Sequence, residues 1–582
     1  MTRTSGTLLQ PAAPRWELPE AVDEERVRAL ADNLSLPEDL CTILVARGYG
    51  DPSGARDFLR PRVESLPDPG TLRDLPTAVE RISGAIEAGE QILVHGDYDV
   101  DGICATALLT RWIRRLGGQA EAFVPHRLRH GYDLGEGGLE RARECGARLL
   151  ITVDCGIVAH DAVARARELG LDVIVTDHHA PGEELPDALA VVNPNRADDH
   201  SGRGVLCGAG VAFQLCRALG ESHGVPLESL LEDLDLVALA TVADLVPLKG
   251  ENRILVRIGL RALERTRKPG LRALLDVCGL QGRPEAGRVG FTIAPRINAV
   301  GRMEDAGQAL DLLLTEDAPE ALRLAEHADG VNRSRQDEDR RTLHEALAQL
   351  EESYDPDRDW GVVLAGQGWH PGVIGIVASR VVERIHRPVV MIALGGDEGR
   401  GSGRSIPGVH LRDALARCAD HLGRFGGHAA AAGLDVRRES IEAFRTAFNE
   451  TVREALDPEH LRPRIRIDVE CSAGGLTLEL ADRLRHLGPH GMGNPRPVFL
   501  ARGLAVEGAR EVGQGHLKLR LRGGGRNLEA IGFSMVERFP VEEWGSGEVD
   551  VVFQLTVNDF RGRRSPQLKL LDLRRSGSWP GP

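Results

Sequence analysis

The densest group of chemically useful side chains in this sequence is the acidic segment Asp97-Tyr98-Asp99-Val100-Asp101-Gly102. Three carboxylates at alternate positions repel one another unless a cation lies between them, and hard oxygen ligands suit Mg²⁺, Mn²⁺ or Ca²⁺. The segment follows an apolar run at 92–94, typical of a buried strand, and leads into a helical stretch from about 103 to 116. We therefore expect this segment to hold divalent metal for phosphoester hydrolysis.

Two other interpretations of this segment are less favoured. A calcium-binding EF-hand loop opens with the same Asp-x-Asp-x-Asp-Gly pattern, but its twelfth position requires a glutamate. Counting from Asp97, that position holds Leu108, and the segment follows a strand rather than a helix. A solvated acidic turn is the other alternative, and the apolar residues on both sides of the segment argue against it.

Further polar groups follow later apolar runs. Asp154 comes after a predicted strand at 148–153, His178 and His179 after one at 171–176, and Asp244 after an apolar helix around 233–242. Strands that alternate with helices between about 76 and 250 predict βαβ units and a parallel sheet, whose carboxyl edge is where sites gather. One acid in such a place is often only a helix N-cap. Several together predict a metal site, and Asp with His suits Mn²⁺ or Zn²⁺ more than Ca²⁺.

The composition sets wider limits. A length of 582 residues predicts about three to five domains. The net charge of -15 argues by itself against a nucleic-acid binder, although local basic clusters matter more than the total. Nine cysteines without a CxxC spacing predict reduced core residues. The N-terminus lacks the apolar region of a signal peptide, and no apolar run approaches the ~20 residues of a membrane span, so we expect a soluble, cytoplasmic protein.

No competing catalytic motif is present in the sequence. GxSxG, P-loop and HExxH patterns are missing, so neither a serine nucleophile nor a zinc-protease helix is indicated. Gly208-Ala209-Gly210 begins like a dinucleotide-binding loop, but Phe213 stands where a third glycine would be needed. We predict close helix packing there.

The motifs, taken in order, resemble the DHH phosphoesterase superfamily and, within it, the RecJ family of bacterial single-stranded-DNA-specific exonucleases. The resemblance extends from about residue 90 to 570. The matching segments are HGDYDVDG (95–102), TVDCG (152–156), TDHH (176–179), GAGVAF (208–213), TVADLVPL (241–248), PRINAVGR (295–302), HPGVIGIVASR (370–380), FGGHAAAAG (425–433) and GPHGMGNPRPVF (488–499).

Residue patterns and resemblance together predict the architecture of an α/β protein. Alternating apolar and mostly basic residues in several short segments after 463 predict an all-β region, which the resemblance identifies as an OB-fold. The predicted parts are an N-terminal helical cap (1–75), a parallel-sheet DHH catalytic domain (76–302), a long connecting helix (303–355), an α/β DHHA1 substrate-binding domain (356–460) and a C-terminal OB-fold β-barrel that binds nucleic acid (461–582).

The resemblance also implies a metal centre. Two divalent ions, Mn²⁺ or Mg²⁺, are expected on Asp97, Asp99, Asp154, His178 and Asp244, with Asp154 between them. His179 completes the catalytic set as a phosphate contact or a support for the ligands. Asp101 is expected to support its loop, and His95 to lie behind the ligands or in the core. The pyrophosphatase branch has a ligand His at the position of Leu93, which disfavours that branch.

Substrate residues are expected from both halves of the protein. Arg127 and Arg302 are candidates for the 5′-phosphate. In the DHHA1 domain we expect His370, Ser402, Arg404 and His428, with Gly401-Ser402-Gly403-Arg404-Ser405 and Gly426-Gly427-His428 forming loops that let backbone N–H groups approach a phosphate.

The expected activity is metal-dependent 5′→3′ degradation of single-stranded DNA to 5′-mononucleotides in repair and recombination. The expected partners are single-stranded DNA with a 5′ end, a single-stranded-DNA-binding protein and a RecQ-type helicase, with the chain acting as a monomer and without a membrane. A DHH phosphodiesterase for short or cyclic oligonucleotides is the enzymatic alternative, and such enzymes lack the C-terminal barrel. A noncatalytic DNA-binding scaffold would have no need of the acidic and His ligands.

Overall fold

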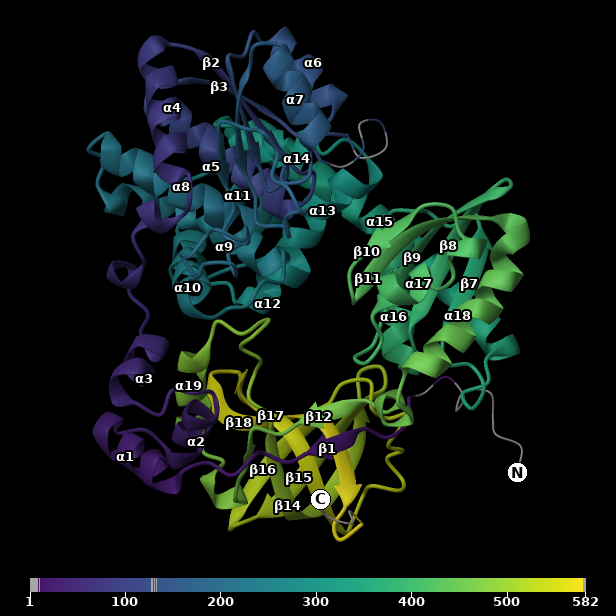
Figure 1. Ribbon diagram of the computed structural model, residues 1–582. Coiled ribbons are helices and arrows are strands. Elements are labelled where there is room, and N and C mark those ends of the chain that lie inside the picture. The colour runs from purple at the N-terminus through teal and green to yellow at the C-terminus, as the bar shows by residue number, and fades with distance from the viewer. Residues whose placement is uncertain (1–8, 10, 127–128, 130, 132, 579–582) are drawn as a thin grey trace.

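The structure is a computed structural model that describes residues 9, 11–126, 129, 131 and 133–578. Three bodies are arranged in a ring (Figure 1), which we name the first body (75–314), the second body (360–455) and the barrel body (464–575). None of the described helices is both long enough and apolar enough to span a bilayer.

The first body is built on a five-stranded, wholly parallel sheet, which confirms the predicted parallel core. Ile92, Leu93 and Val94 of the inner strand β2 are fully buried, because helices cover both faces of the sheet. The strand order is β3-β2-β4-β5-β6. The strands are β2 (Gln91–Gly96), β3 (Gln119–Phe123), β4 (Leu149–Val153), β5 (Asp172–Thr176) and β6 (Ala190–Val192), and the helices that follow or flank them are α4 (Leu75–Ala88), α5 (Val100–Arg115), α6 (Glu136–Glu144), α7 (His160–Glu168) and α8 (Gly208–Ser222).

A helical layer completes the first body. It comprises α9 (Leu234–Ala243), α10 (Gly250–Glu264), α11 (Pro269–Val277), α12 (Ala286–Arg288), a π-helical turn (Val289–Ile293), α13 (Ala294–Met303) and α14 (Gly307–Leu314).

The connecting helix α15 spans Ala318–Ser353, 36 residues, and is shorter than the predicted 303–355. Its start is fixed by Asp317, whose side chain accepts the backbone N–H of Glu320, and by Pro319 in the first turn. The preceding residues form α14, whose Leu310, Leu312 and Leu313 belong to the core of the first body.

The second body carries a mixed sheet of order β10-β11-β9-β8-β7. The predicted loop at 401–405 is wrong, because residues 401–404 end a central strand that pairs with β8 and β11. The glycines there permit close packing: a Cβ placed on Gly401 would lie 2.6 Å from the side chain of Leu434. Gly426 and Gly427 likewise lie in a strand. The elements are β7 (Val362–Gln367), α16 (Ile374–Ile385), β8 (Val389–Gly395), β9 (Glu398–Arg404), α17 (Leu411–Ala416), β10 (Phe425–Gly427), β11 (Ala431–Arg437) and α18 (Ile441–Ala455).

The barrel body confirms the predicted OB-type barrel. β14 pairs with both β15 and β17, and this double pairing closes the sheet on itself. The elements are β12 (Arg464–Arg466), β13 (Val469–Glu470), α19 (Leu478–Leu484), β14 (Phe499–Val512), β15 (His516–Gly523), β16 (Arg526–Gly532), β17 (Glu548–Phe560) and β18 (Arg563–Arg575).

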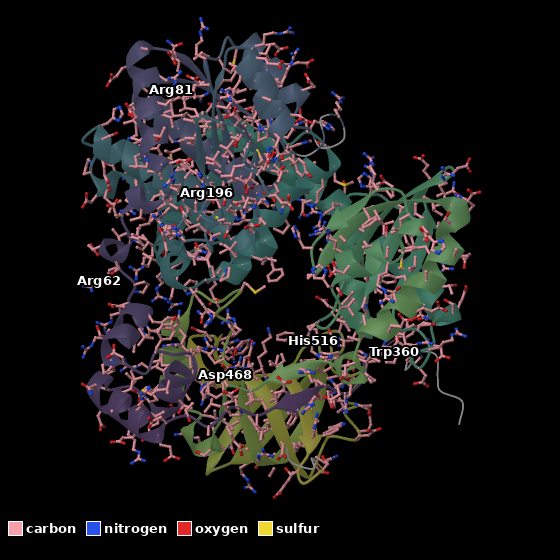
Figure 2. The ribbon with its side chains drawn as sticks, viewed as in Figure 1. Arg62, Arg81, Arg196, Trp360, Asp468 and His516 are labelled. Carbon is pink, nitrogen blue, oxygen red and sulfur yellow. The ribbon has the colours of Figure 1, made fainter. Side chains whose placement is uncertain are left out.

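The N-terminal segment packs on this barrel, far from its neighbours in sequence. β1 (Arg15–Glu17) pairs with β12, and α1 (Glu24–Leu34), α2 (Glu38–Ala46) and α3 (Pro52–Leu59) share one apolar core with the barrel strands. Arg47 also contacts Asp468, labelled in Figure 2, at 3.3 Å.

Direct contacts join the three bodies. Arg253 of α10 donates to the carbonyl oxygens of Leu487 (2.9 Å) and Gly488 (3.0 Å), which ties the first body to the barrel body. Arg384 of α16 lies 3.4 Å from Glu537 of the barrel body. The second body is held to α15 by Arg380, 3.1 Å from the buried Asp339.

Candidate metal centre and substrate site

The acidic segment after β2 is folded tightly by its own backbone. Asp99 caps α5, because its carboxylate accepts the N–H groups of Asp101 (2.9 Å) and Gly102 (3.2 Å). A Cβ placed on Gly102 would lie 2.4 Å from the carbonyl oxygen of Asp97, so only glycine allows this return of the chain. The arrangement holds Asp97 and Asp99 together at the carboxyl end of β2.

Asp154 follows β4 in a backbone conformation that is unusual for a side chain other than glycine. Its φ is 62°, in the left-handed region, and its N–H donates to the carbonyl oxygen of Thr176 at 3.0 Å. The first residue of α8 is Gly208, where an added Cβ would lie 2.5 Å from the Cβ of Asp154. The start of α8 therefore approaches Asp154 as closely as a backbone can.

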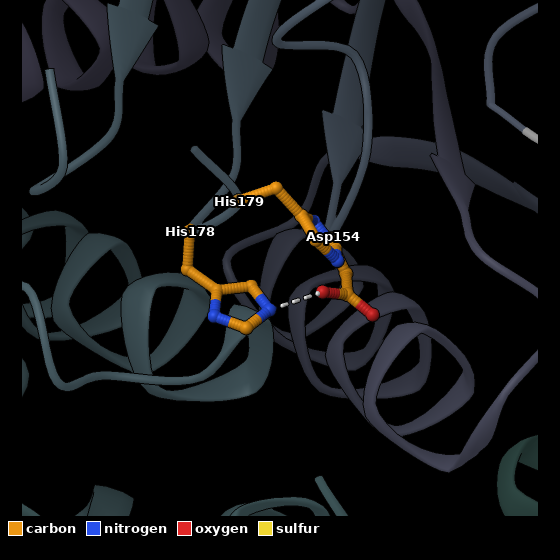
Figure 3. A group of neighbouring side chains, drawn as sticks. All are labelled: Asp154, His178 and His179. Atoms are coloured by element: carbon orange, nitrogen blue, oxygen red, sulfur yellow. Dashed lines mark ion pairs between the residues drawn. The ribbon is translucent and has the colours of Figure 1, made fainter. Parts of the chain in front are cut away.

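Asp177 orients the two histidines after β5. Its carboxylate accepts the backbone N–H groups of Ile157 (3.0 Å), His178 (2.7 Å) and His179 (3.0 Å), and the Nδ1 of His179 lies 2.7 Å from Asp177 Oδ1. His178 is thereby turned so that its Nε2 lies 3.1 Å from Asp154 Oδ1 (Figure 3). The same nitrogen lies 3.8 Å from Asp244 Oδ2.

The predicted ligands converge in three overlapping groups, in each of which the possible ligand atoms all lie within 4.8 Å of one another. Asp154 and His178 each belong to two of them. The groups are Asp97, Asp99 and Asp154; Asp154, His178 and His179; and Asp101, His178 and Asp244.

The residues fit divalent cations. Four buried atoms at this edge make no hydrogen bond with the described part of the chain: Asp97 Oδ1, Asp154 Oδ1, His178 Nε2 and Asp244 Oδ2. Such buried acceptors are costly unless a cation satisfies them. Carboxylate oxygens beside an imidazole nitrogen are a donor set that suits Mn²⁺.

The pKa values of these groups reflect the same crowding. Burial, then the neighbouring Asp99, raises the pKa of Asp97 well above its usual value, and burial, then Asp101, does the same to Asp154. Burial and the charge of Asp101 raise the pKa of Asp244 to about 8. Burial lowers the pKa of His178, which keeps its imidazole neutral and able to bind metal.

Asp101 reaches another element instead of its own loop. Its two carboxylate oxygens accept the N–H groups of Gly208 (2.6 Å) and Ala209 (2.7 Å) and so anchor the start of α8. His95 is fully buried in β2 and lies outside the three groups. Its Nδ1 is 3.7 Å from the Sγ of Cys155.

Ser402 and Arg404 meet the start of α16 in the second body. A Cβ placed on Gly375 would lie 2.8 Å from both Arg404 Nη2 and Ser402 Oγ. Arg404 Nη1 donates to Ser402 Oγ at 3.2 Å. Burial lowers the pKa of this guanidinium, which remains a cation at neutral pH. The helix N-terminus, a hydroxyl and a guanidinium thus form a place that suits a phosphate.

Two glycine contacts connect this place with the metal centre. A Cβ placed on Gly301 would lie 2.5 Å from the carbonyl oxygen of Tyr98, and one on Gly372 would lie 2.9 Å from the carbonyl oxygen of Arg302. His370 belongs to the same turn, where its Nδ1 accepts the N–H of Gly372 at 3.0 Å.

The two remaining predicted substrate residues are less well placed. His428 is exposed in the turn between β10 and β11. Arg127 lies outside the described residues.

Three exposed apolar side chains near this edge escaped the sequence analysis. Leu245 follows Asp244 directly and is 66% exposed, Phe291 in the π-helical turn is 88% exposed, and Met492 is 56% exposed. Leu248 donates its backbone N–H to the carbonyl oxygen of Met492 at 2.8 Å, so Met492 lies beside the segment after Asp244. The one signal for Phe291 was its position four residues before the PRINAVGR motif.

Comparisons with known proteins agree with this division of the chain. Three family models match it: the DHH family, N-terminal domain over residues 91–241, the DHHA1 domain over 360–454 and the RecJ OB domain over 467–572. The chain is 39% identical to the single-stranded-DNA-specific exonuclease RecJ of Salmonella typhimurium, and the match covers 95% of this chain and 99% of that protein.

Solved structures give the same result. The crystal structure of RecJ from Thermus thermophilus in complex with Mn²⁺ is similar with a TM-score of 0.84 and 34% identity, over 97% of this chain and 80% of that one. The complex of RecJ from the same organism with Mg²⁺ is similar with a TM-score of 0.77 and 32% identity, over 97% of this chain and 79% of that one.

Proposed function

This chain belongs to the RecJ family of single-stranded-DNA-specific exonucleases, and we propose that it hydrolyses single-stranded DNA from its 5′ end with Mn²⁺ or Mg²⁺ as the metal. The observation that carries the proposal is the convergence, at one edge of the sheet, of five side chains that follow three strands and one helix: Asp97, Asp99, Asp154, His178 and Asp244. A noncatalytic scaffold would have no use for buried acceptors crowded in this way.

Two divalent ions, when bound here, supply a water of lowered pKa and neutralise the charge that develops on the phosphate. Asp154 and His178 each belong to two of the three ligand groups, and only the carboxylate has two oxygens to offer, so we assign to Asp154 the position in which it would hold both ions. Asp177 keeps His178 turned toward Asp154 through its backbone hydrogen bonds.

His179 is assigned the contact with the phosphate. Burial opposes its charge, but the hydrogen bond and the charge of Asp177 outweigh burial and raise the pKa of His179 to about 9. The imidazolium therefore carries a proton on Nε2 at neutral pH, while Nδ1 donates to Asp177. A cationic donor beside the metal ligands suits a phosphate oxygen whose charge increases during attack.

We assign the 5′→3′ direction of degradation to the second body. Arg404, Ser402 and the start of α16 bind the terminal 5′-phosphate, with His370, His428 and Arg302 around it. A strand held by its 5′-phosphate places its first phosphodiester bond at the metal ligands, which gives 5′-mononucleotides as products. The contacts through Gly301 and Gly372 support this arrangement, since they join the metal-binding segment to the turn of His370.

We assign this activity to DNA repair and recombination. We assign it to the cytoplasm, with the chain acting as a monomer beside a single-stranded-DNA-binding protein and a RecQ-type helicase. The barrel body disfavours a phosphodiesterase limited to short or cyclic oligonucleotides, because such an enzyme needs no separate surface for a long strand.

Digestion of strands labelled at either end tests the proposal. With Mn²⁺, a 5′-labelled single strand is expected to release labelled mononucleotide at once, and a 3′-labelled strand to shorten gradually, while duplex DNA stays intact. Chelation of the metal abolishes both reactions. Early release of mononucleotide from the 3′ label would contradict the polarity, and turnover in excess chelator would contradict the metal centre.

A further inference from the structure

A cavity lies where the first body meets the barrel body. It has a volume of about 460 Å³ and lies between α10, the 283–287 segment and the 482–490 segment. A second cavity of about 510 Å³ continues over β17 and β18. The two cavities share four lining residues, and we name them together the junction groove; the shared residues are Glu285, Arg485, His490 and Arg496. Each cavity falls within the range of about 300–1,000 Å³ that is usual for ligand sites.

The junction groove carries unbalanced positive charge. Within the described part of the chain, neither Arg257 nor Arg283 forms a salt bridge. Arg257 Nη1 donates to the carbonyl oxygen of Gly488 at 2.7 Å, and Arg283 Nη2 to that of Arg257 at 3.3 Å. Burial, then the charge of Arg283, lowers the pKa of Arg257 to about 10. These cations repel each other, and an anion bound between them would relieve the repulsion.

Two of the three acids that line the groove are already paired, and the third, Asp559, is an exposed residue of β17 in the second cavity. Glu285 lies 2.5 Å from Arg496, and Asp482 is bonded to Arg564 and lies 3.8 Å from Arg485. They therefore offset cations other than Arg257 and Arg283. Lys569 adds a further positive charge to the second cavity. None of the described acids forms a salt bridge with Lys569.

The strand faces of the barrel offer less unpaired positive charge for a phosphate backbone than the basic residues in the sequence indicated. Lys518 of β15 pairs with Glu529 at 2.8 Å, and Arg522 pairs with Glu507 at 3.3 Å. Compensated surface charges attract a phosphate backbone weakly. The unpaired arginines of the junction groove are better suited to it.

Two short segments lead from the groove toward the residues around the metal centre. Leu248, four residues after Asp244, is bonded to Met492, which lies two residues after His490 of the groove. Phe291 lies four residues after Gly287 on the groove's other wall. Both Met492 and Phe291 are exposed and apolar, and an exposed aromatic ring is a surface on which a nucleobase can stack.

We propose that the junction groove binds the phosphodiester backbone of the DNA strand downstream of the cleaved end, and that Phe291 and Met492 contact the bases between the groove and the metal centre. This inference rests on the proposed exonuclease function and adds the route of the uncut strand. Arginine guanidinium groups bind phosphate oxygens in a forked geometry, and each neutralised phosphate makes binding more sensitive to salt.

Gly287 allows a direct test, because a Cβ added there would have no atom within 4 Å and the residue lines the groove. Gly287→Glu, Gly287→Lys and Gly287→Gln change the charge of the groove by -1, +1 and 0 at one position without steric conflict. Arg283→Gln removes a native charge. Arg28→Gln makes the same charge change on α1, where Arg28 pairs with Glu24 and does not line the groove, and it serves as the matched control.

Binding is measured for all variants as the fluorescence anisotropy of a labelled 5′-phosphorylated oligothymidylate of about 20 nucleotides, with chelator present so that nothing is cut. The slope of log affinity against log salt is expected to weaken by about 0.7 in Gly287→Glu and Arg283→Gln and to steepen by about 0.7 in Gly287→Lys. Gly287→Gln and Arg28→Gln are expected to keep the wild-type slope.

Equal slopes in all five variants would overturn the junction groove as the route. Mn²⁺-dependent digestion by the wild-type chain distinguishes a failure of the groove proposal from a failure of the proposed exonuclease function. If the wild type digests single strands and the slopes are equal, only the groove is refuted. If the wild type does not digest them, the proposed function fails as well.

Discussion

The metal affinity of this centre should depend steeply on pH, because bound cations must displace protons from crowded carboxyl groups. Asp244, with a pKa of about 8, is protonated in the metal-free protein at pH 6 and half ionised at pH 8. Displacement of its proton alone makes binding about 50-fold weaker at pH 6 than at pH 8. One proton costs about a factor of ten per pH unit below the pKa, or about 100-fold over two units, and half ionisation at pH 8 already accounts for a factor of about two. Asp97 and Asp154 also have raised pKa values and can only increase this factor.

Calorimetric titration of the metal-free protein with Mn²⁺ at pH 6, 7 and 8 measures the effect. Repeating each titration in two buffers of different ionisation enthalpy counts the protons released. Asp244→Asn, which removes one titrating group, should release about one proton fewer at pH 7. An apparent Kd that changes less than about fivefold between pH 8 and pH 6 would refute the reasoning, because it would mean that no ligand carboxyl holds a proton in the metal-free state.

The same shifts have a definite sign for stability. A carboxyl with a raised pKa keeps its proton in the folded state while the unfolded chain loses it, so the folded state binds more protons between the two pKa values. The metal-free protein should therefore lose stability as the pH rises from about 4 to 8. Saturating Mn²⁺ should remove much of this loss, so the increase in Tm on adding Mn²⁺ should be larger at pH 8 than at pH 6.

Three substitutions test the site further. Asp154→Asn should abolish Mn²⁺-dependent turnover while the circular dichroism spectrum stays that of the wild type, and retained turnover would contradict the position of Asp154 between the ions. Gly208→Ala should weaken Mn²⁺ binding about 10- to 100-fold, the range found for residues that position ligands, because the new Cβ would press on Asp154; titration calorimetry measures it, and Gly210→Ala, whose Cβ would come no closer than 3.2 Å to Leu206, is the control. Arg404→Ala should weaken the binding of 5′-phosphorylated ends by about 1.5–3 kcal/mol and hardly change that of 5′-hydroxyl ends, and equal loss on both would contradict a phosphate contact.

Much of the metal centre was predictable because its signals are local. An apolar run followed by an acid marks the end of a buried strand, and the carboxyl ends of parallel strands meet at one edge. Asp97, Asp99 and Asp154 could therefore be placed together without coordinates. The sequence could not place the contact of Asp101 with Gly208 and Ala209, since it joins residues more than 100 positions apart.

Other features were missed for the opposite reason, because a local rule was outweighed by tertiary packing. Glycine and serine at 401–405 favour a turn, but pairing with β8 and β11 on both sides makes the segment a central strand. The N-terminal helices were predicted, but nothing in their own residues shows that they pack on a barrel more than 400 positions away. Phe291 carries no local signal in the sequence that would show its exposure in the structure.

The backbone at Asp154 explains why asparagine, and not alanine, is the informative substitution there. A φ of 62° is unfavourable for most side chains, and of the order of 1–3 kcal/mol is stored in such a residue. Asp and Asn tolerate this region better than alanine does. Asp154→Ala would therefore remove the ligand and also strain the backbone between β4 and α7. Asp154→Asn keeps the shape and the backbone preference and removes only the charge, so a loss of turnover in that variant belongs to the metal centre alone.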